Sequence, residues 1–446
     1  MKKSIGLLLT ASLMLSGIFV GCEKEKPAQQ EEPSQGTETL TSTTIPVENA
    51  LASLSKLSKE LYGETKTAKK NYSVEVFGGV KTKSSRNTLP DTTLYIVNME
   101  DGYAVLSAQS KIKTEVFCIT ESGSISAADI QKAILRMEYT PSPQKSSDNE
   151  NDGGDDSEED EDDYFEDLGR ETVPAIIAAS VLNQWYYGCE PEYEVNATKA
   201  NTYTGTPNTS AMLKTKWDQG APFNNFRKDG APAGCVAVAT AQIIEFNALN
   251  HGYTSFTDGK KFDWNLLFTV CHCSNPSTFG LSSAQQQEAS NFLSYVGLKK
   301  NCYIRYDATK GSYGYADGAK RTFKNMKYKS VKKYLGFEKA DKNRAIAQLT
   351  NGFPMYMGGV RGTSSGHAWV LDGIYVRKVY NETGSYLRTE SFFHINWGWQ
   401  GWSDGYYTQG VFDTSKRQAV EAGVDFGYSA GSYNYTWDYR TITYSL

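Results

Sequence analysis

The stretch GCVAVATAQ, residues 234–242, begins a run of small and apolar residues near the middle of this 446-residue chain. It follows Pro232 and the turn-favouring pair Asp229-Gly230, so we expect a buried helix whose first turn contains Cys235. The first turn of a helix carries unpaired N–H groups and partial positive charge, and both stabilise an anion there. The sequence therefore predicts that Cys235 is a nucleophile that reacts as a thiolate.

A second motif, GHAWVLDG at residues 366–373, supplies a candidate base. Here His367 alternates with its neighbours in the pattern of a strand, which would hold the ring rigidly. The chain contains four histidines, so few bases are possible. His394 is the rival candidate, because it shares a strand face with Asn396. Asp372 lies on the face opposite His367, and we expect it to be structural.

A third motif, FFHINWGW at residues 392–399, supplies an amide after another apolar strand. In a thiolate–imidazolium pair, the second ring nitrogen needs a partner that fixes its orientation. A neutral amide oxygen does this without adding charge. We therefore assign this orienting role to Asn396.

The order Cys, His, Asn, together with GCVAVATAQI, GHAWVLDG and INWGWQGWSDGYY, resembles the streptopain family of secreted bacterial cysteine peptidases, which have the papain-like fold. The upstream stretch at residues 216–224 resembles the family segment that ends in Gly-x-Pro-Tyr-Asn, with Phe223 in place of the tyrosine. These motifs span much of the C-terminal half of the chain. Their joint occurrence in this order is far more specific than any one of them alone.

The resemblance implies roles for further residues. Gln219 would donate its side-chain amide to the oxyanion beside the N–H of Cys235. Trp397 would cover the contact between Asn396 and His367 from water. The substrates would be proteins and peptides, the acyl group would pass to water, and the site would need no cofactor and no metal.

The fold class implied by the resemblance is α+β. We expect a papain-like peptidase with a helical part and an antiparallel sheet, preceded by a small α+β prodomain, with nucleophile and base on opposite sides of a cleft. The strands of the sheet are expected at 354–360, 367–375, 392–397 and 406–411, and a mobile loop at 422–435. The expected segments are a lipoprotein-type signal peptide at 1–22, a flexible tether at 23–45, an inhibitory prosegment at 46–140, an acidic disordered linker at 141–170 and the peptidase domain at 171–446.

The N-terminus predicts export. Two lysines precede an apolar stretch at residues 5–20, which is too short to cross a bilayer comfortably and is typical of a signal peptide. The following Gly21-Cys22 resembles a bacterial lipoprotein cleavage site, so Cys22 would carry lipid and anchor the chain to a membrane at the periplasm or the cell surface. The alternative is ordinary secretion, with Cys22 as a spare thiol.

Residues 46–140 read as a small module of their own. Four leucines, spaced from Leu51 to Leu61, share one helical face, strand-like runs follow, and a short helix is expected at 127–137. The run TLYIVNMEDGYAVLSAQSK at 93–111 resembles the prosegments of streptopain-like peptidases, which block the cleft until they are cut away. The alternative is a permanent accessory or substrate-binding domain.

Two patterns invite a metal interpretation, and we favour neither. Residues 148–167 hold 13 acidic side chains and no lysine or arginine, which is typical of a solvated linker where activating cleavage would occur. The start of this run imitates a calcium-binding EF-hand loop, but Asp155 occupies a position that is normally apolar, and flanking helices are missing. The CHC motif at 271–273 lacks a second pair of ligands at metal-site spacing.

Other classes of function stay open. A papain-like transglutaminase or amidase would use the same nucleophile and base. With 29 tyrosines and 8 tryptophans, the chain could instead be a catalytically idle surface lipoprotein that binds glycan or protein on aromatic platforms. Nucleic acid is not an expected partner, because the formal net charge is -5 and no basic helix is present.

Overall fold

The computed structural model describes residues 44–63, 71–80, 88–112, 114–139, 165–166, 169–187, 202–270, 281–337, 339–361, 365–381, 383–412 and 438–446. The predicted signal peptide with Cys22, the acidic run at 148–163, the CHC motif and the predicted loop at 422–435 lie outside these residues.

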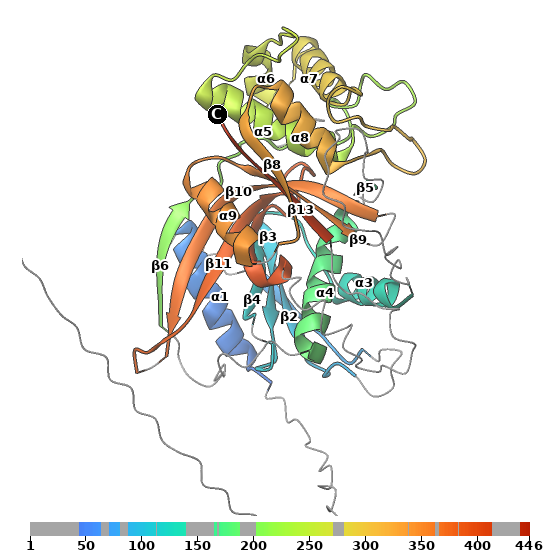
Figure 1. Ribbon diagram of the computed structural model, residues 1–446. Coiled ribbons are helices and arrows are strands. Elements are labelled where there is room, and N and C mark those ends of the chain that lie inside the picture. Colours follow the sequence, from blue (N-terminus) through green and yellow to red (C-terminus); the bar gives the residue numbers. More distant parts are fainter. Residues whose placement is uncertain are drawn as a thin grey trace, which may run out of the picture. The chain divides into compact units, whose positions relative to one another are not determined.

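An antiparallel sheet of 11 strands runs through the described part of the chain. Its order is β1-β2-β3-β4-β12-β11-β10-β9-β13-β8, and β6 pairs with β10 (Figure 1). The strands of this sheet are β1 (Tyr72–Phe77), β2 (Leu94–Met99), β3 (Gly102–Ser107), β4 (Val116–Thr120), β6 (Thr202–Thr209), β8 (Lys329–Leu335), β9 (Met355–Arg361), β10 (Ser365–Tyr380), β11 (Tyr386–Asn396), β12 (Gly405–Thr408) and β13 (Asp438–Ser445). A second, two-stranded sheet pairs β5 (Phe165–Glu166) with β7 (Tyr313–Gly314).

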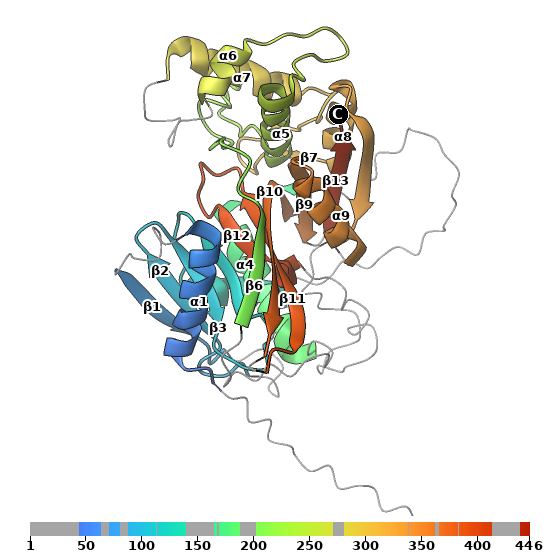
Figure 2. The ribbon, with the colours of Figure 1, turned by 90° about the vertical axis from the view of Figure 1, so that its left-hand side faces the viewer.

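Two groups of helices accompany the sheet. The first group gathers at one end of the molecule in both views (Figures 1 and 2) and comprises α5 (Cys235–His251), α6 (Trp264–Val270), α7 (Ser283–Val296) and α8 (Ala316–Asn325). The remaining helices are α1 (Val47–Tyr62), α3 (Ala127–Tyr139), α4 (Thr172–Tyr187) and α9 (Lys339–Thr350), with 3-10 turns η2 (Gly169–Glu171) and η3 (Gln409–Phe412). Helix α1 packs against β3, β4 and β6, whereas α3 and α4 pack together.

Alternation along β10 joins the two halves of the peptidase region. Trp369 and Leu371 enter the core shared by the sheet and α4. Ala368 and Val370 point the other way, into the core of the helical group that surrounds α5. One strand thus belongs to two cores, and the predicted α+β architecture of a helical part plus an antiparallel sheet is confirmed.

The strands of the N-terminal segment do not form a sheet of their own, contrary to the expectation of a separate module. Strand β4 pairs with β12 of the peptidase region, with Ile119 opposite Tyr406. Each of these strands would otherwise leave a row of unpaired N–H and C=O groups at a sheet edge. Sequence periodicity does not reveal such a pairing, because it involves strands almost 300 residues apart.

Most predicted elements of the sheet are confirmed, and the differences have local reasons. The strand expected at 406–411 ends at Thr408, where η3 begins. Strands β6 and β8 were not predicted, because TYTGTPNT and KSVKKYL lack the apolar alternation of a half-buried strand.

Residues 42–446 group into one compact unit by contacts, so the boundary between prosegment and peptidase stays a prediction. Among the helices in the described ranges, none has the length and apolarity that crossing a bilayer requires.

Candidate active site

Cys235 is the first residue of α5, as the sequence predicted. The helix is buried along its length, and Cys235 itself is 2% exposed. Gly234 precedes it with φ +91, and a Cβ on this glycine would lie 3.0 Å from the Ile304 side chain. The backbone therefore turns sharply into the helix, and this places the sulfur at the end where unpaired N–H groups gather.

His367 lies on β10 and is 1% exposed. Its Nε2 atom is 2.8 Å from the carbonyl oxygen of Trp397. Since a carbonyl can only accept a hydrogen bond, Nε2 carries the proton and donates it. In the neutral ring the lone pair is then on Nδ1, which is the tautomer that a base needs to take a proton from a thiol.

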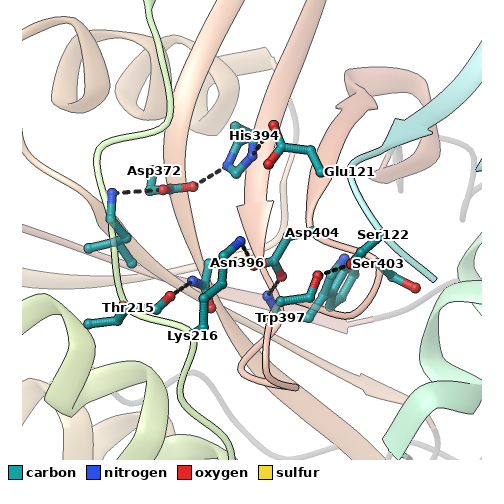
Figure 3. Close-up of polar contacts among 12 residues, drawn as sticks. Glu121, Ser122, Thr215, Lys216, Asp372, His394, Asn396, Trp397, Ser403 and Asp404 are labelled. Carbon is teal, nitrogen blue, oxygen red and sulfur yellow. Dashed lines mark hydrogen bonds and ion pairs between the residues drawn. The ribbon is translucent and has the colours of Figure 1, made fainter. Parts of the chain in front are cut away.

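Asn396 ends β11, and its role differs from the one predicted. Its Oδ1 atom accepts hydrogen bonds from Nε2 of Gln242, at 3.1 Å, and from the N–H of Gly398, at 3.0 Å. Its Nδ2 atom donates to the carbonyl of Thr215 at 2.8 Å (Figure 3). The direct contact expected with the His367 ring is thus replaced, at Nε2, by the main-chain carbonyl of the next residue. Asn396 instead anchors the turn that provides this carbonyl.

The turn at residues 396–398 brings nucleophile and base together. Gly398 has φ +74, and a Cβ there would lie 3.2 Å from Cγ1 of Val238 on α5. Val238 and Gln242 follow Cys235 by one and two helical turns, so the three share a face of α5. The turn therefore contacts the helix face that bears Cys235 and also holds the ring of His367.

Gln219 lies beside the entrance to α5, where the oxyanion donor was predicted. It is 8% exposed, and its main-chain carbonyl accepts a hydrogen bond from the N–H of Ala233 at 2.8 Å. Ala233 is two residues before Cys235, so the Gln219 segment runs alongside the start of the nucleophile helix. The same segment is tied to the other half of the site, because the carbonyl of Trp217 accepts from the N–H of Gln400 at 3.1 Å.

The ring that stacks closest on the base is Trp399, not the predicted Trp397. The ring centroids of His367 and Trp399 are 4.5 Å apart with an interplanar angle of 25°. The centroid of Trp397 is 6.1 Å from that of His367, and the Trp397 indole donates to the hydroxyl of Tyr407. Trp397 nevertheless touches the base through its carbonyl. Because 397 and 399 alternate, the two indoles stack on each other at 5.3 Å.

His394, the rival base, is held in a buried ion cluster. Its Nδ1 atom is 2.6 Å from a carboxylate oxygen of Asp372, and its Nε2 atom is 3.7 Å from Glu121 (Figure 3). Burial alone would lower the pKa of His394, but the two carboxylates raise it to about 10. A ring that stays protonated cannot act as a base near neutral pH. Asp372 also accepts from the N–H of Leu213, at 3.0 Å, which makes it structural as predicted.

A second buried ion pair supports the turn from below. Asp404, fully buried, accepts a hydrogen bond from the N–H of Trp397 at 2.9 Å and lies 3.3 Å from the Lys216 ammonium (Figure 3). Burial raises the pKa of Asp404 to about 6. Burial also disfavours the charge on Lys216, but the Asp404 carboxylate outweighs this and raises the pKa of Lys216.

The other described cysteines lack the features of a nucleophile. Cys118 and Cys302 are fully buried, and burial raises the pKa of both thiols, that of Cys302 to about 11. Cys302 lies 3.4 Å from the hydroxyl of Thr322 rather than beside an imidazole. Such thiols are inert packing groups.

Sequence reasoning missed three residues of this site: Gln242, Trp399 and Asp404. Gln242 is a fully buried amide inside an apolar helix, and that is a signal the sequence carried. Trp399 shares its strand-like alternation with Trp397. Nothing in the SDG run marks Asp404, because its importance depends on Lys216, which is 188 residues away.

A cysteine at a helix N-terminus, a histidine on a facing strand and an amide at the helix entrance define a papain-like cysteine peptidase site. Residues 217–407 match the family model described as Peptidase C10 family. The chain belongs to the streptopain-like cysteine peptidases, which are hydrolases.

The relatives with known names are distant. Streptopain of Streptococcus pyogenes is 26% identical over 281 residues, which cover 52% of this chain and 63% of streptopain. The thiol protease/hemagglutinin PrtT of Porphyromonas gingivalis is 26% identical over 252 residues, covering 51% of this chain and 25% of that protein. Among solved structures, a fragment of prointerpain A from Prevotella intermedia is 18% identical with a TM-score of 0.46, covering 83% of this chain and 98% of the fragment. The chain thus spans less than two thirds of the length of streptopain.

Proposed function

We propose that this chain is an endopeptidase that cleaves proteins through a thioester on Cys235, with His367 as the base. One observation carries the proposal. The turn at 396–398 contacts the Cys235 face of α5 and accepts the Nε2 proton of His367, so the other ring nitrogen serves the thiol.

The chemistry proceeds in two halves. Nδ1 of His367 takes the thiol proton, and the Cys235 thiolate attacks the carbonyl carbon of the peptide bond. The resulting oxyanion accepts hydrogen bonds from the Gln219 amide and the Cys235 N–H. The C–N bond then breaks, the imidazolium gives its proton to the departing amine, and a thioester remains. His367 next removes a proton from water, which attacks the thioester and releases the acid and the thiolate.

The enzyme is made as an inactive precursor in this proposal, and residues 46–140 act as its inhibitory prosegment. Support comes from β5, whose backbone pairs with β7. Strand β7 contacts α5, and β5 also contacts β10, so residues 165–166 lie between the elements that carry nucleophile and base. An extended segment paired there occupies the position in which a substrate strand would add to β7. Cleavage within 141–170 would release it.

The proposed location is a membrane-anchored exported lipoprotein, with lipid on Cys22 and release possible after processing. Its support is the sequence of the N-terminus alone: a basic start, a short apolar stretch and Gly21-Cys22.

The test uses purified precursor with three versions of the chain: wild type, Cys235→Ala and the control Cys302→Ser. Wild type and Cys302→Ser should process themselves and digest casein, and mass spectrometry of the new N-termini should place the first cut within 141–170. Cys235→Ala should stay intact and take up no thiol-directed peptide inhibitor. Undiminished processing by purified Cys235→Ala would discard the assignment, and transfer of the acyl group to an added amine instead of water would identify a transglutaminase.

A further inference from the structure

One polar side chain inside the nucleophile helix is unexplained by the chemistry above. Gln242 is fully buried in α5, although burying an amide is costly unless it is hydrogen-bonded. Its Nε2 atom donates to Oδ1 of Asn396 at 3.1 Å. Gln242 follows Cys235 by two helical turns on the same face, so this contact links the nucleophile helix to the end of β11.

The link continues from Asn396 to the base through a single peptide group. Oδ1 of Asn396 also accepts from the N–H of Gly398 at 3.0 Å. The carbonyl of that same peptide group belongs to Trp397, and it accepts from Nε2 of His367 at 2.8 Å. Hydrogen bonds in such a chain polarise one another, so holding the nitrogen end of the peptide group strengthens the bond at its oxygen end.

The amide of Asn396 has two anchors of different origin. Its nitrogen donates to the carbonyl of Thr215, which belongs to the segment that leads to Gln219. Its oxygen is held by Gln242. Without Gln242, the oxygen keeps only the bond from the turn that it is meant to orient. Gly398 allows this arrangement, because a side chain there would press against Val238 on α5.

We propose that Gln242 is a positioning residue for the reacting pair, fixing the ring of His367 relative to Cys235 through Asn396 and the peptide group between Trp397 and Gly398. It touches neither substrate nor the reacting atoms. This inference rests on the proposed peptidase function, and it adds a residue that couples the two halves of the site.

The test compares Gln242→Met with Asn247→Leu. Methionine keeps the length of glutamine and favours helix, but it cannot donate to Asn396. Asn247 is a matched control because it is also a fully buried amide on α5, and its Nδ2 atom donates to the hydroxyls of Tyr328 and Tyr444 instead. Both variants lose buried hydrogen bonds, so a purely structural role predicts similar effects on activity.

We expect Gln242→Met to lower kcat by about 10- to 100-fold with KM nearly unchanged, because a small displacement of a catalytic group has effects of this size. The pH profile of Cys235 alkylation by iodoacetamide should also change, losing reactivity on its acid side, because the displaced ring no longer shares the thiol proton. Asn247→Leu should keep the wild-type profile at equal or greater cost in thermal stability. Gln242→Glu, the milder variant, should regain activity relative to wild type as the pH falls, since a protonated carboxyl can donate to Asn396.

Wild-type kcat and alkylation profile in Gln242→Met would overturn the inference, as would the same losses in Asn247→Leu. If Gln242→Met does not fold, failure of Gln242→Glu to recover activity at low pH overturns it. Failure of the peptidase proposal is a different result: wild type would then neither cleave protein nor be alkylated at Cys235.

Discussion

The carboxylate of Glu60, on α1 of the N-terminal segment, lies 3.3 Å from the guanidinium of Arg377 on β10. Arg377 is 1% exposed, and its Nε also donates to Glu390 at 2.7 Å. The ionic contact joins parts of the chain 317 residues apart and sits on the sheet away from the reacting groups. Attachment of the N-terminal segment therefore depends on buried charge as well as on the β4–β12 pairing.

Glu60→Gln should weaken this attachment. Arg377 keeps Glu390, so the loss is that of one charge-assisted hydrogen bond, about 1.5–3 kcal/mol in the free energy of unfolding. The measurement is urea unfolding of the Cys235→Ala precursor, which avoids proteolysis. Glu171→Gln is the control, because its pair with Lys132 has side chains 46% and 58% exposed and should contribute under about 1 kcal/mol. Equal losses in the two variants would contradict the role assigned to Glu60.

His394 should make stability depend on alkaline pH. Its pKa is about 10 in the folded chain, against an ordinary value of 6.5. Because the folded value is the higher one, protonated His394 contributes stability that is fully present below about pH 6.5 and is lost as the pH rises through about 10. One pKa unit corresponds to about 1.4 kcal/mol, so the contribution is on the order of a few kcal/mol.

The measurement is the urea midpoint between pH 6 and 10.5 for the Cys235→Ala precursor with and without His394→Gln. Tyrosines and lysines titrate in both proteins, so only the difference between them reports His394. That difference should shrink as the pH approaches 10.5. A difference that stays constant over this range would show that the imidazole is not held protonated by Asp372 and Glu121.

Trp399→Leu should reduce activity by about 2- to 10-fold in kcat/KM, because a stacked aromatic contact contributes about 0.5–1.5 kcal/mol beyond its buried area. The loss should grow with ionic strength or added solvent access to the ring of His367, which Trp399 covers. Steady-state kinetics on a peptide substrate provide the measurement. Trp264→Leu serves as the control, since its indole packs in the helical group and donates to the Thr254 carbonyl. Comparable kinetic losses in both would mean that Trp399 only stabilises the fold.

Gln219→Ala should lower kcat by about 100- to 1000-fold while KM changes little, because an oxyanion donor acts mainly in the transition state. Alkylation of Cys235 by iodoacetamide should stay at the wild-type rate, since this reaction forms no oxyanion. Gln287→Ala, which removes an exposed amide on α7 that donates to Asn291, should leave both rates unchanged. An equal fall in alkylation and in peptide cleavage would assign Gln219 to holding the nucleophile instead.

Local sequence was sufficient for the parts of the site that depend on one element each. An apolar run after a proline and a glycine turn predicts a helix beginning at Cys235, and the structure has it there. Alternation around His367 predicts a strand, and the opposite face assigned to Asp372 is confirmed by its contacts with Leu213 and His394. These are consequences of backbone periodicity, which neighbouring residues decide among themselves.

What holds the base was decided only by the tertiary structure. An amide at position 396 reads as a partner for the ring, yet the carbonyl of Trp397 takes that place, and Gln242 takes the amide. The choice depends on how closely Gly398 lets the turn approach α5, a distance set by packing between segments some 160 residues apart. The union of the N-terminal strands with the peptidase sheet has the same cause. Hydrogen bonds between distant backbones leave no trace in the periodicity of either strand, whereas the periodicity itself is written residue by residue along the chain.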